Sequence, residues 1–339
     1  MSRFPRAARE LLLAVLLSSR GIALAQGAPS LALPIDCAVG RSCVVQNYVD
    51  RDPGPGARDY RCGFLTYDGH KGTDIRVIDA TALREGVAVL AAAPGRVRAI
   101  RDGMDDVSVK AIGKQAIAGR EAGNSVVIVH GDGWETQYAH MRKGSIAVHP
   151  GDVVAAGAKL GVVGLSGDTE FPHVHFEVRY RGKTIDPFVG VAGGEPCSTG
   201  KDPLWQARAA SALAYTATGV LGAGIAGGVP VTSDDDVDRE KTARFGAAAP
   251  AAVFWVQIYG ARDDDVEELR LIAPDGQLLA EHRDTISRNR AQWISYAGVR
   301  ARGAWPAGTY RGEYALYRGV RREKILSLAK EITLTAGSS

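Results

Sequence analysis

The repeated pattern of short apolar runs between glycine turns is the feature that most restricts how this chain can fold. Runs such as "TDIRVI", "VAVLAAAPGRVRAIRDG" and "DVVAAGAKLGVVGLSGD" alternate or are briefly apolar, and then end at Gly, Asp or Pro. This pattern is typical of β-strands, and no helical periodicity accompanies it. The 41 glycines also favour turn-rich β structure over long helices. We therefore expect an all-β protein.

Two loops of the first half carry their own signals. The stretch "HGDGW" at 130–134 predicts a tight hairpin, because Asp-Gly suits turns that demand a positive φ. The segment 102–122 is an insertion between two strands, and we expect it to project from the sheet as a hairpin extension.

The first residues have the layout of a secretory signal peptide. Arginines precede the apolar run 11–17, and the small-residue triplet 23–25 follows it. The apolar run is too short to cross a bilayer, so no stable membrane span is expected once residues 1–25 are removed. The protein is therefore expected to be exported, either to the periplasm or out of the cell.

The length of 339 residues allows two domains. Residues 26–62 are rich in Pro, Gly and Asp and should form an N-terminal loop segment, followed by a first β domain over residues 63–200. Residues 201–240 are expected to be a linker, and residues 241–339 a second, small β-sandwich. Because this second domain offers no recognisable constellation of chemistry-bearing residues, we expect it to bind or position rather than to catalyse.

The four cysteines are even in number and belong to an exported chain, which favours disulfides over metal binding. Four cysteines allow three pairings. Nearness in the chain favours Cys37 with Cys43, and Cys62 with Cys197 would then join the two ends of the first β domain.

Histidines and one aspartate gather in that domain. His173 and His175 are one residue apart in a strand-like run, so their side chains share one face. His70 and Asp74 are four apart around a glycine, and His140 ends another run. Taken singly, His173, His175 and His140 also fit a half-exposed strand. Asp74 could likewise be a helix cap beside an incidental His70. Together they supply three ligands for a catalytic zinc and two imidazoles to manage protons and charge.

The motifs "HKGTD", "YAH" and "PHVHFEV", in this order, resemble those of the lysostaphin-type (β-lytic, LytM-like) zinc metallopeptidases. The resemblance implies a compact antiparallel β-sandwich or barrel, called the duplicated hybrid motif. It also implies that His70, Asp74 and His175 hold one zinc ion per chain. The remaining pair, His140 and His173, would be the catalytic residues.

The family cuts the peptide part of bacterial cell walls, so the expected function is that of a zinc endopeptidase acting on peptidoglycan peptides. One alternative is an inactive member that serves as a wall-binding or amidase-activating scaffold. Another is a zinc carboxypeptidase for D-Ala-D-Ala, which lacks this order of motifs. A net charge of only +3 does not imply a polyanion-binding surface, and no nucleic-acid partner is expected.

Several other residues carry weaker expectations. Tyr138 should share a face with His140 and could support it, although packing is the simpler role. His130 in a turn and His149 before "PGD" are expected at the surface. A chain ending near Asp202 is expected to keep its zinc and to hydrolyse small soluble peptides.

Overall fold

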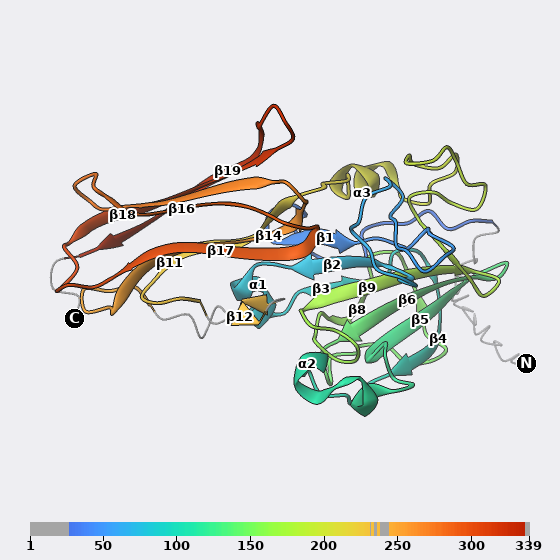
Figure 1. Ribbon diagram of the computed structural model, residues 1–339. Coiled ribbons are helices and arrows are strands. Elements are labelled where there is room, and N and C mark those ends of the chain that lie inside the picture. The colour runs from blue at the N-terminus through green and yellow to red at the C-terminus, as the bar shows by residue number, and fades with distance from the viewer. Residues whose placement is uncertain (1–26, 231, 234–235, 238–243, 336–339) are drawn as a thin grey trace, which may run out of the picture.

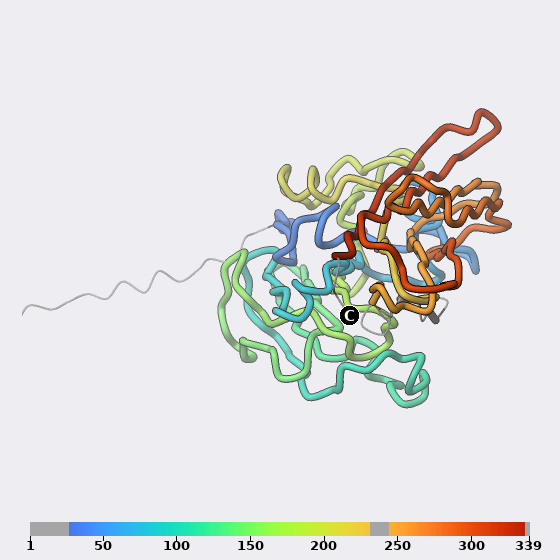
Figure 2. The backbone as a smooth tube through the Cα atoms, turned by 90° about the vertical axis from the view of Figure 1, so that its left-hand side faces the viewer, coloured from blue at the N-terminus to red at the C-terminus, as the bar shows by residue number. Residues whose placement is uncertain are grey.

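Every pair of strands in the described part of the chain runs antiparallel, which confirms the all-β prediction. The computed structural model describes residues 27–230, 232–233, 236–237 and 244–335, so the expected signal peptide lies outside the described residues. Figures 1 and 2 show two β-rich units side by side, the first coloured blue to green and the second orange to red. None of the described helices is long and apolar enough to cross a membrane.

The first unit is built on an eight-stranded sheet with the order β1-β2-β9-β6-β5-β4-β7, in which β10 pairs with the free part of β9. A small second sheet, β3-β8, packs against it. The strands of this unit are β1 (Cys43–Asn47), β2 (Thr73–Val77), β3 (Ala88–Leu90), β4 (Gly95–Arg101), β5 (Asn124–Gly131), β6 (Trp134–Met141), β7 (Val153–Val154), β8 (Lys159–Val162), β9 (His173–Tyr180) and β10 (Lys183–Ile185).

The central strand β9 shows why the main sheet has two different faces. Val174, Phe176 and Val178 are fully buried in the hydrophobic core. The alternate residues, His173 and His175 among them, therefore point to the opposite face. Alternation along one strand thus separates the core from a polar face that is available for a functional site.

The segment 26–62 is more ordered than expected, because it contributes β1 to the edge of the main sheet. Leu31 is completely buried, and its backbone exchanges hydrogen bonds with Leu204 and Gln206. The segment 201–240 is likewise not a simple linker. It forms the helix α3 (Ala207–Ala212) and the strand β11 (Gly219–Ala226), and β11 pairs with β14 of the second unit. Burial of apolar side chains, which composition did not reveal, orders the described parts of both segments, residues 27–62 and 201–230.

The insertion 102–122 is not a hairpin, since it forms α2 (Val109–Ile112) and the 3-10 turn η1 (Lys114–Ile117). Ser108 caps the start of α2, and Gly113 ends it with a φ of 78°. In Figures 1 and 2 the insertion lies at the lower edge of the molecule, away from the orange and red strands. By contrast, the Asp-Gly hairpin between β5 and β6 is present, with positive φ at Asp132 and Gly133.

The second unit is a sandwich of a three-stranded sheet, β11-β14-β17, and a four-stranded sheet, β16-β15-β18-β19. Its remaining strands are β14 (Ala251–Ala261), β15 (Val266–Ile272), β16 (Leu278–Thr285), β17 (Arg290–Arg300), β18 (Gly308–Arg318) and β19 (Glu323–Leu334). Two short strands, β12 (Thr232–Ser233) and β13 (Asp236–Val237), pair with each other, and a single-turn helix, α1 (Ala80–Glu85), follows β2 in the first unit.

The two units share part of one hydrophobic core. Leu221 of β11 and Tyr259 of β14 belong to the same buried cluster as the apolar residues of β2 and β9. The Tyr215 hydroxyl donates a hydrogen bond of 2.8 Å to Asp59 of the first unit. Both favoured disulfides are present, Cys37–Cys43 and Cys62–Cys197.

Candidate functional site

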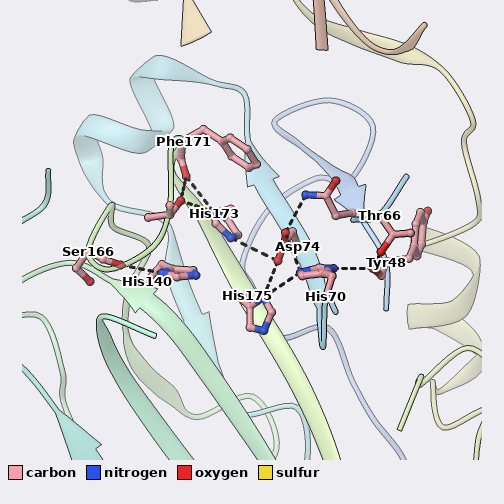
Figure 3. A network of polar contacts seen from close by, with 11 residues as sticks. Tyr48, Thr66, His70, Asp74, His140, Ser166, Phe171, His173 and His175 are labelled. Carbon is pink, nitrogen blue, oxygen red and sulfur yellow. Dashed lines mark hydrogen bonds and ion pairs between the residues drawn. The ribbon is translucent and has the colours of Figure 1, made fainter. Parts of the chain in front are cut away.

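The three residues expected to hold a metal converge on one point of the polar face. Strands β2 and β9 are neighbours, and their register places Asp74 directly opposite His175. His70, in the turn before β2, brings its Nε2 to 3.1 Å from Asp74 Oδ2 and 3.2 Å from His175 Nδ1. His175 Nδ1 lies 2.8 Å from Asp74 Oδ1. Figure 3 shows the three side chains pointing toward one another.

Neighbouring groups fix the orientation of these side chains. The Nδ1–H of His70 donates to the backbone carbonyl of Tyr48 at 2.6 Å, which leaves the lone pair on Nε2. The Asn47 amide donates to Asp74 Oδ2 at 2.9 Å. Such outer hydrogen bonds hold metal ligands in place and set the tautomer of a ligating imidazole. Sequence reasoning missed both partners, because a register shift in β1 between Val45 and Asn47 sets Asn47 opposite Asp74, and Tyr48 contributes a main-chain carbonyl.

The donor set fits a zinc ion. Two imidazole nitrogens and one carboxylate are ligands that catalytic zinc sites use, with the fourth position left open. Zinc bonds of about 2.0–2.1 Å in a tetrahedron place neighbouring ligand atoms about 3.3 Å apart. The two imidazole nitrogens, His70 Nε2 and His175 Nδ1, are 3.2 Å apart, and each lies 2.8 to 3.1 Å from one of the two carboxylate oxygens of Asp74. An ion could therefore enter after small movements of the side chains.

His173 and His140 line the side of this cluster that faces β6. The Nδ1–H of His173 donates to the carbonyl of Phe171 at 2.9 Å, and its Nε2 lies 3.4 Å from Asp74 Oδ1. His140 donates from Nδ1 to the carbonyl of Ser166 at 2.8 Å. The rings of His140 and His173 are 4.7 Å apart between centroids. In both rings Nε2 is thus the nitrogen left for a substrate or a proton.

The backbone of His140 is strained. Its φ is +60°, in the left-handed region that residues with a side chain rarely adopt. The amide of His140 donates to Ala122 at the end of the insertion, and its carbonyl accepts from Gly164. Strain of this kind persists where surrounding contacts impose it, and it is common at functional sites. The insertion thus helps to aim this imidazole.

Charge and burial set opposite pKa shifts within the cluster. Burial would raise the pKa of Asp74, but His70 and then His173 hold it well below its ordinary value. Burial, followed by the neighbouring His173 and His175, lowers the pKa of His140 well below its ordinary value. His140 is consequently a neutral imidazole near pH 7, able to accept a proton.

The open side of the site lies at His175. The side chain of His175 is 18% exposed, whereas that of His70 is 1% exposed. The ring of Tyr67 stands against His70, with centroids 4.5 Å apart, and Tyr67 is more than half exposed. A substrate would approach from this side.

The structure corrects two weaker expectations about this domain. Tyr138 does not support His140, because a register shift in β6 and the positive φ of His140 turn the two side chains to different faces. Its hydroxyl instead meets the backbone amide of Ala92 in the core. His130 is buried, with ring contacts to Pro94 and Thr136, rather than exposed in a turn. His149 is exposed as expected.

A second buried polar cluster lies inside the C-terminal sandwich, where none was expected. Glu267 on β15 is completely buried and accepts hydrogen bonds from Ser295 at 2.5 Å, Trp293 at 3.1 Å and Tyr314 at 3.3 Å. His282 Nε2 is farther away, at 3.7 Å. Here neutral donors saturate the carboxylate, so no converging set of free ligand atoms remains among these residues.

Comparison with known proteins agrees with the motifs. Residues 68–187 match the family described as "Peptidase family M23". The chain is 40% identical over 65 residues to the peptidoglycan DD-endopeptidase ShyA of Vibrio cholerae, a segment that covers 19% of this chain and 15% of that protein. It is 32% identical over 119 residues to the murein hydrolase activator NlpD of Escherichia coli, covering 35% of this chain and 25% of that protein.

Among solved structures, a zinc-containing peptidase from Vibrio cholerae is 26% identical, with coverage of 42% of this chain and 38% of that chain and a TM-score of 0.27. The chain thus spans a quarter or less of the length of the two curated relatives. The resemblance expected from "HKGTD", "YAH" and "PHVHFEV" is confirmed by the family match, which contains all three motifs. The segment 68–187 of this chain is a domain of peptidase family M23.

Proposed function

We propose that this protein is an exported, zinc-dependent endopeptidase that hydrolyses peptide bonds of bacterial cell-wall peptidoglycan. The observation that carries the proposal is the convergence of His70, Asp74 and His175, with two more imidazoles beside them. The relative ShyA, by its name, is an endopeptidase of the same polymer. The domain match is to a peptidase family.

In the proposed mechanism His70, Asp74 and His175 hold the ion, and Asn47 and the Tyr48 carbonyl keep two of these ligands oriented. When bound, zinc supplies Lewis acidity that activates water and polarises a peptide carbonyl. His140 and His173 remain outside the ligand set, each with Nδ1 bound to a carbonyl and Nε2 turned toward the site.

These two imidazoles have different roles, one in proton transfer and the other in stabilising negative charge. One accepts a proton from the attacking water and returns it to the leaving amine. The other, with a second proton on Nε2 because its Nδ1–H is already donated to a carbonyl, donates a hydrogen bond to the oxygen that gains negative charge in the transition state. The lowered pKa of His140 favours its neutral form, which suits a proton acceptor.

A non-catalytic role is the second candidate, and the relative NlpD motivates it because that protein is named as an activator of murein hydrolases. Against this role, all five residues that hydrolysis requires are present and lie together. An activator needs the fold and a docking surface but no such set of donor atoms.

The deciding experiment uses purified, cross-linked peptidoglycan and the zinc-loaded protein. Hydrolysis should release new amine termini within the cross-linked peptides, identified by mass spectrometry of the products. A chelator should stop the release, and added zinc should restore it. If wild-type protein releases nothing, yet accelerates a purified amidase on the same wall, the activator role is correct.

A further inference from the structure

The C-terminal sandwich touches the catalytic sheet beside the site, on its polar face. Arg76 lies two residues after Asp74 on β2, which places it about 7 Å farther along the same face of the strand. Arg76 is buried, and its Nη1 donates to the side-chain oxygen of Gln292 at 2.6 Å. Gln292 belongs to β17 of the sandwich. The same nitrogen also donates to Gln46 of β1 at 2.9 Å.

Arg76 in turn supports the turn that precedes β9. Its guanidinium carbon lies 4.4 Å from the centre of the Phe171 ring, a cation–π arrangement. The carbonyl of Phe171 is the group that accepts the Nδ1–H of His173, at 2.9 Å. The hydroxyl of Thr169 donates to the same carbonyl, also at 2.9 Å. A short chain of contacts therefore runs from Gln292 through Arg76 and Phe171 to His173.

Buried contacts surround Gln292. Tyr259 of the neighbouring strand β14 is buried in the core of the first unit, and Leu221 of β11 is buried with it. Gln257 of β14 is buried and donates to the Gln292 oxygen at 3.3 Å. The acceptor that faces Arg76 is consequently fixed by both units.

We propose that Arg76 and Gln292 are a positioning pair, through which the C-terminal sandwich holds the Phe171 turn and thereby the imidazole of His173. This inference rests on the proposed role of His173 in hydrolysis. The sandwich then acts on turnover itself, also for small soluble peptides, and not only on attachment to intact wall. Neither residue touches the substrate, so neither is a catalytic residue.

This inference reverses one expectation from the sequence. A chain ending near Asp202 would lose Gln292, and with it the buried side chains of Leu213, Leu221 and Tyr259. Such a chain would expose part of the catalytic core. For that reason the test uses substitutions in the full-length protein.

The first variant is Gln292→Leu, which leaves an apolar side chain of comparable size and removes the acceptor. With a soluble cross-linked muropeptide as substrate, kcat should fall about tenfold, because small misplacements of a catalytic group are costly. KM should stay within about twofold of wild type, since the substrate contacts are unchanged. Zinc content should be unchanged.

Two further variants separate positioning from packing. Gln292→Glu keeps an oxygen that faces Arg76 and should retain wild-type kcat. Gln277→Leu makes the same chemical change at an exposed turn on another edge of the sandwich and should also leave kcat unchanged. In protein with 15N-labelled histidine, the Nδ1–H signal of His173, assigned by its loss in His173→Ala, should broaden or shift in Gln292→Leu alone.

Three results would overturn the proposal. The first is a wild-type kcat in Gln292→Leu, and the second is an effect on KM alone, which would indicate a docking role. The third is an equal loss in Gln292→Glu, which would indicate packing. If the wild-type protein shows no hydrolysis, the proposed function has failed, while the His173 signal still reports whether Gln292 positions this ring.

Discussion

The two units of this protein each bury a carboxylate in a polar cluster, and the clusters differ in what surrounds it. Asp74 in the eight-stranded sheet of the first unit is 2% exposed and faces three imidazoles. Glu267 in the sandwich is 0% exposed and faces two hydroxyls and an indole N–H. The pKa of Asp74 lies well below its ordinary value, whereas burial raises the pKa of Glu267.

A ligand site and a structural cluster differ in the balance between hydrogen-bond donors and acceptors. Around Glu267 every neighbour that bonds it brings a hydrogen, so the oxygens are matched without a cation. Around Asp74 the neighbouring imidazole nitrogens can present lone pairs. Together with the carboxylate oxygens they supply more hydrogen-bond acceptors than there are hydrogens between them. Such an excess calls for a positive charge, either a proton or a metal ion. A count of hydrogen-bond donors and acceptors therefore distinguishes a ligand site from a structural cluster, which residue type alone does not.

The strongest way to break the comparison is to remove one histidine from each cluster. His175→Ala should abolish tight zinc binding and reduce hydrolysis by at least a thousandfold or so, because the site loses a ligand. The matched change His282→Ala, beside Glu267, should leave zinc content and activity as they are. Metal analysis of the purified proteins and release of amine termini from peptidoglycan measure both. Full zinc occupancy in His175→Ala would remove this ligand assignment.

A smaller effect is expected from the imidazoles that stay outside the ligand set. Alanine at His140 or His173 should lower kcat by about a hundredfold or more while zinc stays bound, since each handles a proton or charge in the transition state. Parallel assays of zinc content and turnover would check this. Loss of zinc in either variant, to the degree seen for His70→Ala, would show that the division of roles is wrong.

A change in the polar cluster around Glu267 should affect the stability of the protein and not its activity. Glu267→Ala leaves three buried donors without their acceptor and should lower the free energy of unfolding by about 1 to 3 kcal/mol. Urea titration followed by tryptophan fluorescence measures this change. Zinc content should be unaffected. An unchanged midpoint would mean that water or another acceptor replaces the carboxylate at no cost.

The last prediction concerns the pH dependence of stability and another buried carboxylate, that of Asp186. Burial raises the pKa of Asp186 to about 6, and its Oδ2 has no hydrogen-bond partner within the described structure. The folded protein thus binds this proton more tightly than the unfolded chain does. Lowering the pH from about 6 to about 4 should therefore stabilise the wild type relative to Asp186→Asn, by on the order of 2 kcal/mol.

The measurement is the difference in unfolding free energy between wild type and Asp186→Asn at several pH values. Both proteins lose other pH-dependent contributions alike, so only the difference is informative. A difference that stays flat across this window would place the pKa of Asp186 near its ordinary value.

Residue type and order in the sequence predict which side chains form the site, and the structure brings together the five that they indicate: His70, Asp74, His140, His173 and His175. The roles of these residues as metal ligands or proton carriers stay predictions. The alternation of "HVHFEV" also predicts correctly that His173 and His175 share the face of β9 opposite the core, because side chains alternate between faces along this regular strand.

The rest depends on irregular backbone and on contacts between distant segments. The positive φ of His140 reverses the face expected for Tyr138, and no sequence pattern announces it. The partners of the site at Asn47, Tyr48 and Phe171 act through a strand irregularity or a main-chain carbonyl, which side-chain identity does not encode. The order of the segments 27–62 and 201–230 likewise comes from apolar residues that meet only after folding.

The Cys62–Cys197 disulfide gives the first unit a property that its strands alone do not provide. The bond joins positions 135 residues apart, and all five site residues lie between them in the chain. The site therefore sits inside a covalent ring. One cut by a foreign protease in an exposed loop of that ring, such as the insertion, opens the ring without separating the pieces. His70 would remain tethered to His175 by the bridge, so a nicked molecule could keep both halves of its site in one particle.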